Sequence, residues 1–158
     1  MQKITTCICF DNQAEEAVKF YISVFPDSVI KSITRCGENE YGGPAGSIRT
    51  IEFQIFGQNF LAVNGGAHFK FTDAVSLIVN CETQEEIDYY WNKLSKGGEE
   101  VACGWLTDKF GLSWQITPSI IIKMLTDPDR NKSDRVIQAI LKMKKLDIEI
   151  LKKAFEGK

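Results

Sequence analysis

One helix pattern occurs twice in this chain. Residues 15–21 (Glu-Glu-Ala-Val-Lys-Phe-Tyr) align without a gap with residues 85–91 (Glu-Glu-Ile-Asp-Tyr-Tyr-Trp). In both copies the glutamates stand in the first turn, where negative charge favours the helix dipole, and apolar residues follow at helical spacing. Each helix lies between β-prone runs, so the chain repeats a strand–helix–strands unit. This duplication predicts an α+β fold in which two such units close one curved sheet.

The β-prone runs and the turn residues define the remaining elements. Strands are predicted at residues 4–10, 28–36, 47–56 and 59–64 around a helix at 15–25, and at 74–81, 99–107 (one or two strands) and 112–117 around a helix at 84–95. Residues 37–46 are predicted as a mobile loop, and Gly57-Gln58 as a hairpin turn. Further helices are predicted at 120–125, 133–145 and 147–155.

These elements divide the chain into two parts. We expect a domain over residues 1–118, with modules at about 1–66 and 72–118, followed by a helical extension over 119–158. We favour the interpretation that the extension covers a surface of the sheet or of a dimer. The alternative is a basic arm for nucleic acid, which the acidic residues beside its lysines argue against.

The strand at residues 112–117 has two different faces. Gly111 closes a turn that opens at Asp108, because glycine enters positive φ without a Cβ clash. The strand then alternates apolar and polar residues, and Pro118 ends it. A strand with one apolar and one polar face lies between a core and a wet cavity, so Gln115 is predicted to project into that cavity, while Trp114 belongs to the core.

Composition excludes several classes of protein. Among 158 residues, 19 are basic and 21 are acidic, a near-balance that argues against a general nucleic-acid binder. No apolar run is long enough for a membrane span, and the N-terminus lacks the apolar core of a signal peptide. The five cysteines are an odd number without a Cys-x-x-Cys pair. We therefore expect a cytoplasmic, reduced protein with mostly buried thiols.

Several stretches together resemble a known family. They are Phe10-Asp11-Asn12-Gln13-Ala14-Glu15-Glu16-Ala17, Asn64-Gly65-Gly66, Asn80-Cys81-Glu82-Thr83, Cys103-Gly104-Trp105-Leu106, Gly111-Leu112-Ser113-Trp114-Gln115-Ile116-Thr117-Pro118 and Met143-Lys144-Lys145-Leu146-Asp147. They resemble the PhnB-like group, named after a demethylubiquinone methyltransferase. That group belongs to the vicinal oxygen chelate superfamily of glyoxalase I, extradiol dioxygenases and bleomycin-binding proteins. The resemblance implies two βαβββ modules forming a curved half-barrel sheet and a homodimer.

The resemblance also implies where a metal would be bound. The superfamily holds a divalent ion with four inward side chains, and its intervals place these positions on Thr6, Ala62, Ser76 and Gln115. Alanine donates nothing, and neutral hydroxyls and amides bind divalent ions weakly. We therefore predict no tightly bound metal and no cofactor, with a weakly held divalent metal as the alternative. A methyl-donor site is not expected either, because no glycine-rich turn follows a first parallel strand.

Four other residues are candidates for the site. Asn64 shares a face with Ala62 and is interpreted either as a ligand contact or as part of a strand-ending turn. His68, the only histidine, and Glu52 are weak candidates for proton transfer; the alternatives are a solvated loop residue and a cross-strand ion pair with Arg49. Trp105 is predicted to wall the cavity and stack on a ligand. Cys7 and Cys9 share a strand face, and inert burial is favoured for both.

Together these features favour a metal-free, small-molecule-binding protein. A polar-tipped cavity without strong acid–base groups supports this hypothesis over the two others. The second hypothesis is an enzyme acting on a small metabolite with a weakly held divalent metal. The third is a non-catalytic structural or regulatory dimer.

Overall fold

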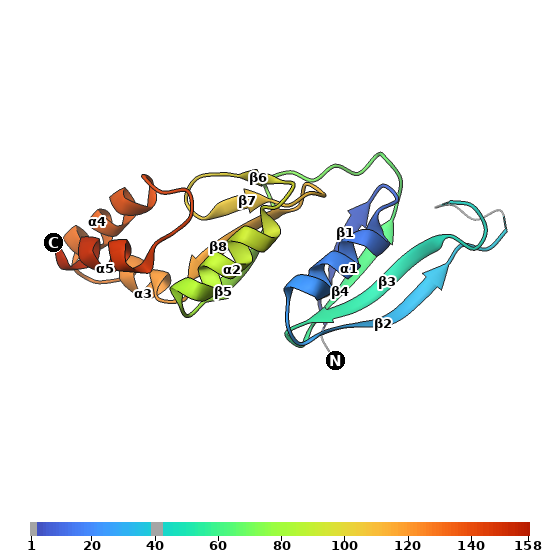
Figure 1. Ribbon diagram of the computed structural model, residues 1–158, viewed down its shortest axis with the longest axis horizontal. Coiled ribbons are helices and arrows are strands. Elements are labelled where there is room, and N and C mark those ends of the chain that lie inside the picture. The colour runs from blue at the N-terminus through green and yellow to red at the C-terminus, as the bar shows by residue number, and fades with distance from the viewer. Residues whose placement is uncertain (1–2, 39–42) are drawn as a thin grey trace. The chain divides into compact units, whose positions relative to one another are not determined.

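The protein is α+β, as the duplication predicts. A computed structural model describes residues 3–38 and 43–158, and the chain divides into two compact units, residues 1–70 and 71–158. Each unit contains a four-stranded mixed sheet with one helix following its first strand, and three further helices follow the second sheet (Figure 1). Part of the loop predicted at 37–46 lies outside the described residues. Within the described part, no helix is both long and apolar enough to cross a bilayer.

Unit 1 has the predicted βαβββ order. Its elements are β1 (Thr6–Phe10), α1 (Ala14–Val24), β2 (Ser28–Arg35), β3 (Ile48–Ile55) and β4 (Gln58–Asn64). The strands are arranged in the order β1-β4-β3-β2, with β1 parallel to β4 and the other pairs antiparallel. The predicted hairpin between β3 and β4 is confirmed one residue earlier. Phe56 and Gly57 both have positive φ, +48° and +76°, the geometry that matches the twist of paired strands.

Helix α1 covers one face of this sheet. Its buried residues pack against β3 and β4, and the ring of Tyr21 stacks on Phe53 with centroids 6.5 Å apart. Phe53 in turn stacks on Phe60 at 5.3 Å. The core of unit 1 therefore lies between α1 and the sheet face that carries these aromatic rings.

Unit 2 repeats the order and then adds helices. Its elements are β5 (Leu77–Cys81), α2 (Gln84–Leu94), β6 (Glu99–Glu100), β7 (Trp105–Thr107), β8 (Ser113–Pro118), α3 (Ile121–Leu125), α4 (Arg130–Ile140) and α5 (Ile148–Glu156). The strands are arranged in the order β5-β8-β7-β6, with β5 parallel to β8. The predicted apolar stripe of α2 is confirmed, because Ile87, Tyr90, Trp91 and Leu94 are all buried.

Helix α4 differs from the prediction of 133–145 at both ends. It begins at Arg130 because Asp129 acts as its N-cap, accepting a hydrogen bond from the backbone N–H of Asn131. It ends at Ile140, after which the N–H groups of Lys142 and Met143 donate to carbonyls three residues back rather than four. Further on, the N–H groups of residues 103 and 104 donate to the carbonyls of residues 143 and 144 at 2.8 and 2.7 Å. The predicted last turn is therefore replaced by a segment that is hydrogen-bonded to residues 103–104.

The side chain of Gln84 joins α2 to the chain that enters α5. Its Oε1 accepts a hydrogen bond from the Ile148 N–H at 2.9 Å, and its Nε2 donates to the Leu146 carbonyl at 3.2 Å. Lys145 also pairs with Asp88 on α2, and the hydrogen bond from Lys145 lowers the pKa of that carboxyl. One turn of α2 therefore holds the C-terminal helices within unit 2.

Candidate functional site

Each sheet has one face that its helix covers and one opposite face, called here the distal face. Strand alternation assigns every side chain to one of them. In unit 2 the helix-covered face includes the buried residues Val79, Cys81, Leu106, Trp114 and Ile116. The distal face carries the alternate residues, which are Ile78, Asn80, Trp105, Thr107, Ser113, Gln115 and Thr117.

Three of these distal residues form a row across the sheet. Ile78 on β5 is registered with Gln115 on β8, and Gln115 is registered with Trp105 on β7. Ile78 is exposed, whereas Gln115 and Trp105 are half-buried. The row places a central amide between an aliphatic and an indole side chain. The row therefore combines one polar group with apolar surface on either side.

The Gln115 amide is held in place from one side. Its Nε2 donates to the Ser76 hydroxyl at 2.8 Å, so two residues predicted for the site are in contact. Among the described residues no group donates to the Gln115 Oε1, which therefore remains available to accept a hydrogen bond from a ligand. Beside this pair, the Ser113 hydroxyl donates to Asp73 at 2.8 Å.

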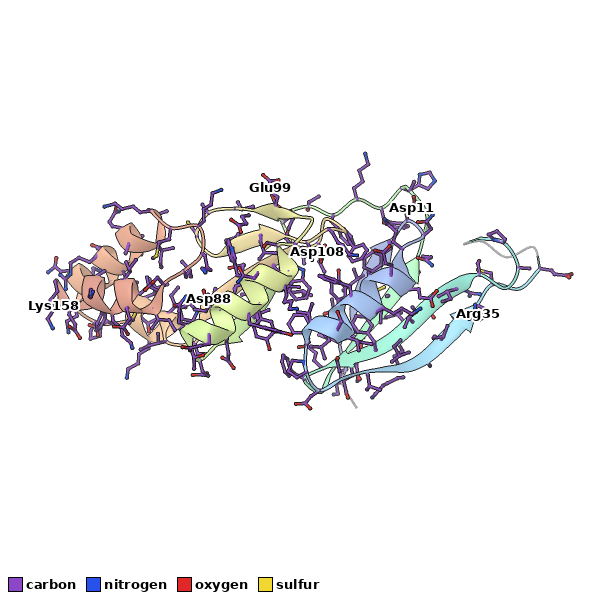
Figure 2. All side chains as sticks on the ribbon, viewed as in Figure 1. Asp11, Arg35, Asp88, Glu99, Asp108 and Lys158 are labelled. Carbon is purple, nitrogen blue, oxygen red and sulfur yellow. The ribbon has the colours of Figure 1, made fainter. Side chains whose placement is uncertain are left out.

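Asp108 fixes the turn that joins β7 to β8, and the sequence pattern indicated only its place in that turn. The side chain is buried, at 2% exposure (labelled in Figure 2). Its Oδ1 accepts from the backbone N–H groups of Phe110 and Leu112, and its Oδ2 accepts from the Trp114 indole N–H at 2.9 Å. Gly111 has φ of +88° and donates to the Asp108 carbonyl, as predicted. The turn thereby sets the register that aligns Trp105 with Gln115.

The distal face of unit 1 includes two rows that cross all four strands. The first contains Cys7, Leu61, Glu52 and Ser32, and the second contains Cys9, Val63, Thr50 and Thr34, in the order β1, β4, β3, β2. On the β3 side the rows are internally bonded, with Ser32 donating to Glu52 at 3.2 Å and Thr34 bonded to Thr50 at 2.6 Å. On the β1 side the rows present two thiols and two aliphatic side chains.

Three residues predicted for the site, Thr6, Ala62 and Asn64, lie on the helix-covered face of unit 1. Thr6 shares the face of the buried residues Ile8 and Phe10, and Ala62 is fully buried with them. The placement of Thr6 and Ala62 toward a cavity was therefore wrong by one residue. Family intervals counted from a helix cannot detect a one-residue offset, which reverses every side chain of a strand.

Asn64 has a structural role that the sequence did not show. Its Oδ1 accepts from the Ala14 N–H, and its Nδ2 donates to the Ile48 carbonyl, both at 2.9 Å. The residue at the N-cap of α1, Gln13, makes no side-chain cap bond. Asn64 therefore satisfies a first-turn N–H of α1 from the end of β4.

The two weak catalytic candidates are not brought together. His68 is exposed in the segment after β4, and Glu52 accepts its hydrogen bond from Ser32. Over residues 3–38 and 43–158 no hydrogen bond or ion pair joins His68 to Glu52. The contacts of these residues therefore do not form an acid–base pair.

The expected burial of cysteines holds for two of the five. Cys36 and Cys81 are buried, and burial, followed by the charges of Glu86 and Glu82, raises the pKa of Cys81 to about 12. Cys7 is exposed and Cys9 is half-buried, so the expected inert burial of these two is wrong. The reason is again strand parity, because β1 directs both thiols to the distal face.

The superfamily's divalent metal does not fit the donors at the four expected positions. Ala62 has no donor atom, and Thr6 belongs to the helix-covered face. Ser76 and Gln115 are neutral donors bonded to one another, a weak combination for a divalent ion. Among the described residues, no three His, Cys, Asp or Glu side chains are grouped as metal ligands would be.

Two consecutive βαβββ units, each a mixed sheet with one covering helix, define a glyoxalase-like fold. A PhnB protein from Bacillus cereus, named after 3-demethylubiquinone-9 3-methyltransferase, is 42% identical; the match covers 74% of this chain and 99% of that one, with a TM-score of 0.68. A protein from Pseudomonas aeruginosa shares the fold at 17% identity, covering 75% of this chain and 98% of that one, with a TM-score of 0.62. A search of curated proteins found no match.

The family model described as 3-demethylubiquinone-9 3-methyltransferase matches residues 2–117. The chain therefore belongs to this PhnB-like family. The match ends within β8, so α3, α4 and α5 follow the matched region.

Proposed function

We propose that this protein binds a small, partly apolar organic molecule on the distal face of unit 2, without a divalent metal ion. The row of Ile78, Gln115 and Trp105 is the observation that supports this proposal. Trp105 supplies a flat surface for stacking, and Ile78 supplies aliphatic contact. The Gln115 amide and the Ser76 hydroxyl supply the polar contact that orients the ligand.

The chemistry of the donors favours binding over catalysis in this proposal. Gln115 and Ser76 are neutral, and neither takes up or releases a proton at ordinary pH. A planar ligand with a carbonyl, hydroxyl or amide group suits them. Transfer of a methyl group is not part of the proposal, because β1 leads into α1 through Asp11-Asn12-Gln13 rather than through a glycine-rich turn.

A thermal-shift screen tests the proposal. The wild-type chain is mixed with a panel of benzoates, quinones and indoles, with and without Mg²⁺, Mn²⁺, Zn²⁺ and Ni²⁺. We expect stabilisation by at least one organic compound with no requirement for a metal, because binding to the folded state raises its stability. Stabilisation that needs a divalent ion would instead support an enzyme, and no stabilisation by any compound would contradict a binding function.

Variants connect the compound found in the screen to the site. Trp105→Ala should weaken its Kd by about tenfold or more through lost stacking, and Gln115→Leu by roughly 2- to 10-fold through one lost neutral hydrogen bond. Gln138→Leu makes the same change on the exposed surface of α4 and serves as the matched control. If calorimetry gives the wild-type affinity for all three variants, the compound binds elsewhere on the protein.

We also propose that the protein forms a homodimer. The C-terminal helical region exposes large apolar side chains, with Ile122 at 67%, Leu141 at 60% and Ile150 at 49% exposure. Such exposure is typical of a surface that another molecule covers. Light scattering at micromolar concentration is expected to give twice the mass of one chain, 17.8 kDa, and a mass of one chain would contradict the proposal.

A further inference from the structure

Strand β1 carries two thiols that neither the fold nor the proposed function uses. Cys7 and Cys9 are two residues apart, so both side chains stand on the distal face of unit 1. Cys7 is exposed and Cys9 half-buried, so both can be reached from solvent. Within the sheet of unit 1, β1 is the first strand of the order β1-β4-β3-β2.

The surroundings of the pair are apolar on the side that the sheet occupies. Cys7 is registered with Leu61 and Cys9 with Val63, and both partners are aliphatic residues of β4. Neither partner supplies a metal ligand or an ion pair. The two sulfur atoms are therefore the donors that this edge of the sheet offers.

The two thiols also interact with one another. Burial raises the pKa of the Cys7 thiol, and the neighbouring Cys9 raises it further through charge repulsion and a side-chain hydrogen bond. A raised pKa keeps the Cys7 thiol protonated near neutral pH, a form that attacks electrophiles and oxidises slowly. A cation that binds strongly to sulfur can still displace both protons, because metal ligation deprotonates a thiol.

We propose that Cys7 and Cys9 form a two-thiolate site for a soft cation of the Cu(I) class. Thiolates are the protein ligands that select Cu(I). In binding, each thiol releases its proton to solvent and donates a sulfur lone pair, and one Cu(I) with two thiolates leaves a singly negative complex. The cation is neither oxidised nor reduced. The site shares no residue with the Ser76–Gln115 pair.

Strand geometry favours a bridging cation over a direct disulfide. Two residues along a strand advance about 6.6 Å, whereas disulfides join Cα atoms about 4.4–6.8 Å apart and usually about 5.5–6 Å apart. A direct bond between Cys7 and Cys9 would therefore lie near the upper limit of this range, beyond the usual separation. A cation between the sulfurs adds a second bond to the bridge, and the paired strand keeps its length.

Anaerobic titration of the full chain with Cu(I), in competition with the chromogenic chelator bicinchoninate, tests the site. We expect one Cu(I) per chain in the wild type and at least about tenfold weaker competition in Cys7→Ser and in Cys9→Ser. Cys103→Ser, which removes a half-buried thiol outside β1, is the matched control and should bind as the wild type does. Circular dichroism confirms that each variant is folded.

Alkylation provides an independent measurement. Cu(I) should protect Cys7 and Cys9 together from N-ethylmaleimide, while Cys103 continues to react, as peptide mass spectrometry would show. Protection of Cys103 instead, unchanged Cu(I) affinity in both β1 variants, or a disulfide between Cys7 and Cys9 in the Cu(I)-treated wild type would overturn the proposal. Failure of the organic-ligand screen would leave this result unaffected, because the two sites share no residue.

Discussion

Replacing Asp108 with alanine is expected to destabilise the protein by roughly 4 kcal/mol, the largest effect among the substitutions considered. The carboxylate accepts three hydrogen bonds at 2.9–3.1 Å, from two backbone N–H groups and from the Trp114 indole. Hydrogen bonds to a charged group contribute about 1.5–3 kcal/mol each, and a buried donor left without an acceptor adds a desolvation cost. At 2% exposure, water cannot replace the carboxylate without rearrangement.

Two further variants test whether the lost hydrogen bonds cause this destabilisation. Asp108→Asn keeps one carbonyl oxygen but loses the second acceptor, so it should cost about half as much. Asp129→Ala removes an exposed acceptor at the N-cap of α4 and should cost about 1 kcal/mol. Chemical denaturation measures all three, and Trp114 fluorescence should shift to longer wavelength in Asp108→Ala. A loss for Asp108→Ala no greater than that for Asp129→Ala would show that the turn does not depend on this carboxylate.

Replacing Gly98 with alanine is expected to cost about 3 kcal/mol or more. A Cβ at this position would stand 2.0 Å from the Thr107 carbonyl oxygen and 2.7 Å from the Asp108 carbonyl carbon. Both are backbone atoms at the end of β7, so relief of the overlap requires the strand to move. Overpacking against less rigid neighbours already costs about 1–3 kcal/mol.

Gly57→Ala is the matched control for Gly98→Ala. Gly57 has φ of +76°, but beyond its two chain neighbours no atom of the described residues lies within 4 Å of a Cβ added there. This variant therefore carries only the left-handed backbone cost of about 1–2 kcal/mol. Denaturation midpoints compare the two variants directly, and an equal loss in both would contradict the close approach at Gly98.

Properties of local origin were predictable from the sequence. The helix stripe of α2 was predicted correctly, because four apolar residues at helical spacing must share one face. The turn at Gly111 and the hairpin at Gly57 were predicted from the ability of glycine to adopt positive φ. The contact of Ser76 with Gln115 joins two positions that family intervals had named.

Properties that depend on distant contacts were not predictable. The burial of Asp108 and the cap that Asn64 supplies to α1 need partners that only folding brings near. The segment after α4 accepts hydrogen bonds from Cys103 and Gly104, which are distant in the sequence. Hydrophobic periodicity contains no information about such bonds.

The sequence by itself determined a duplicated βαβββ chain and the alternation of each strand, because spacing and turn chemistry act over a few neighbouring residues. Tertiary structure alone decided which face of each strand α1 or α2 covers, since covering depends on packing between elements. That choice placed Thr6 and Ala62 on the helix-covered face of unit 1. It also exposed the Cys7 and Cys9 thiols and left the row of Ile78, Gln115 and Trp105 on the face opposite α2.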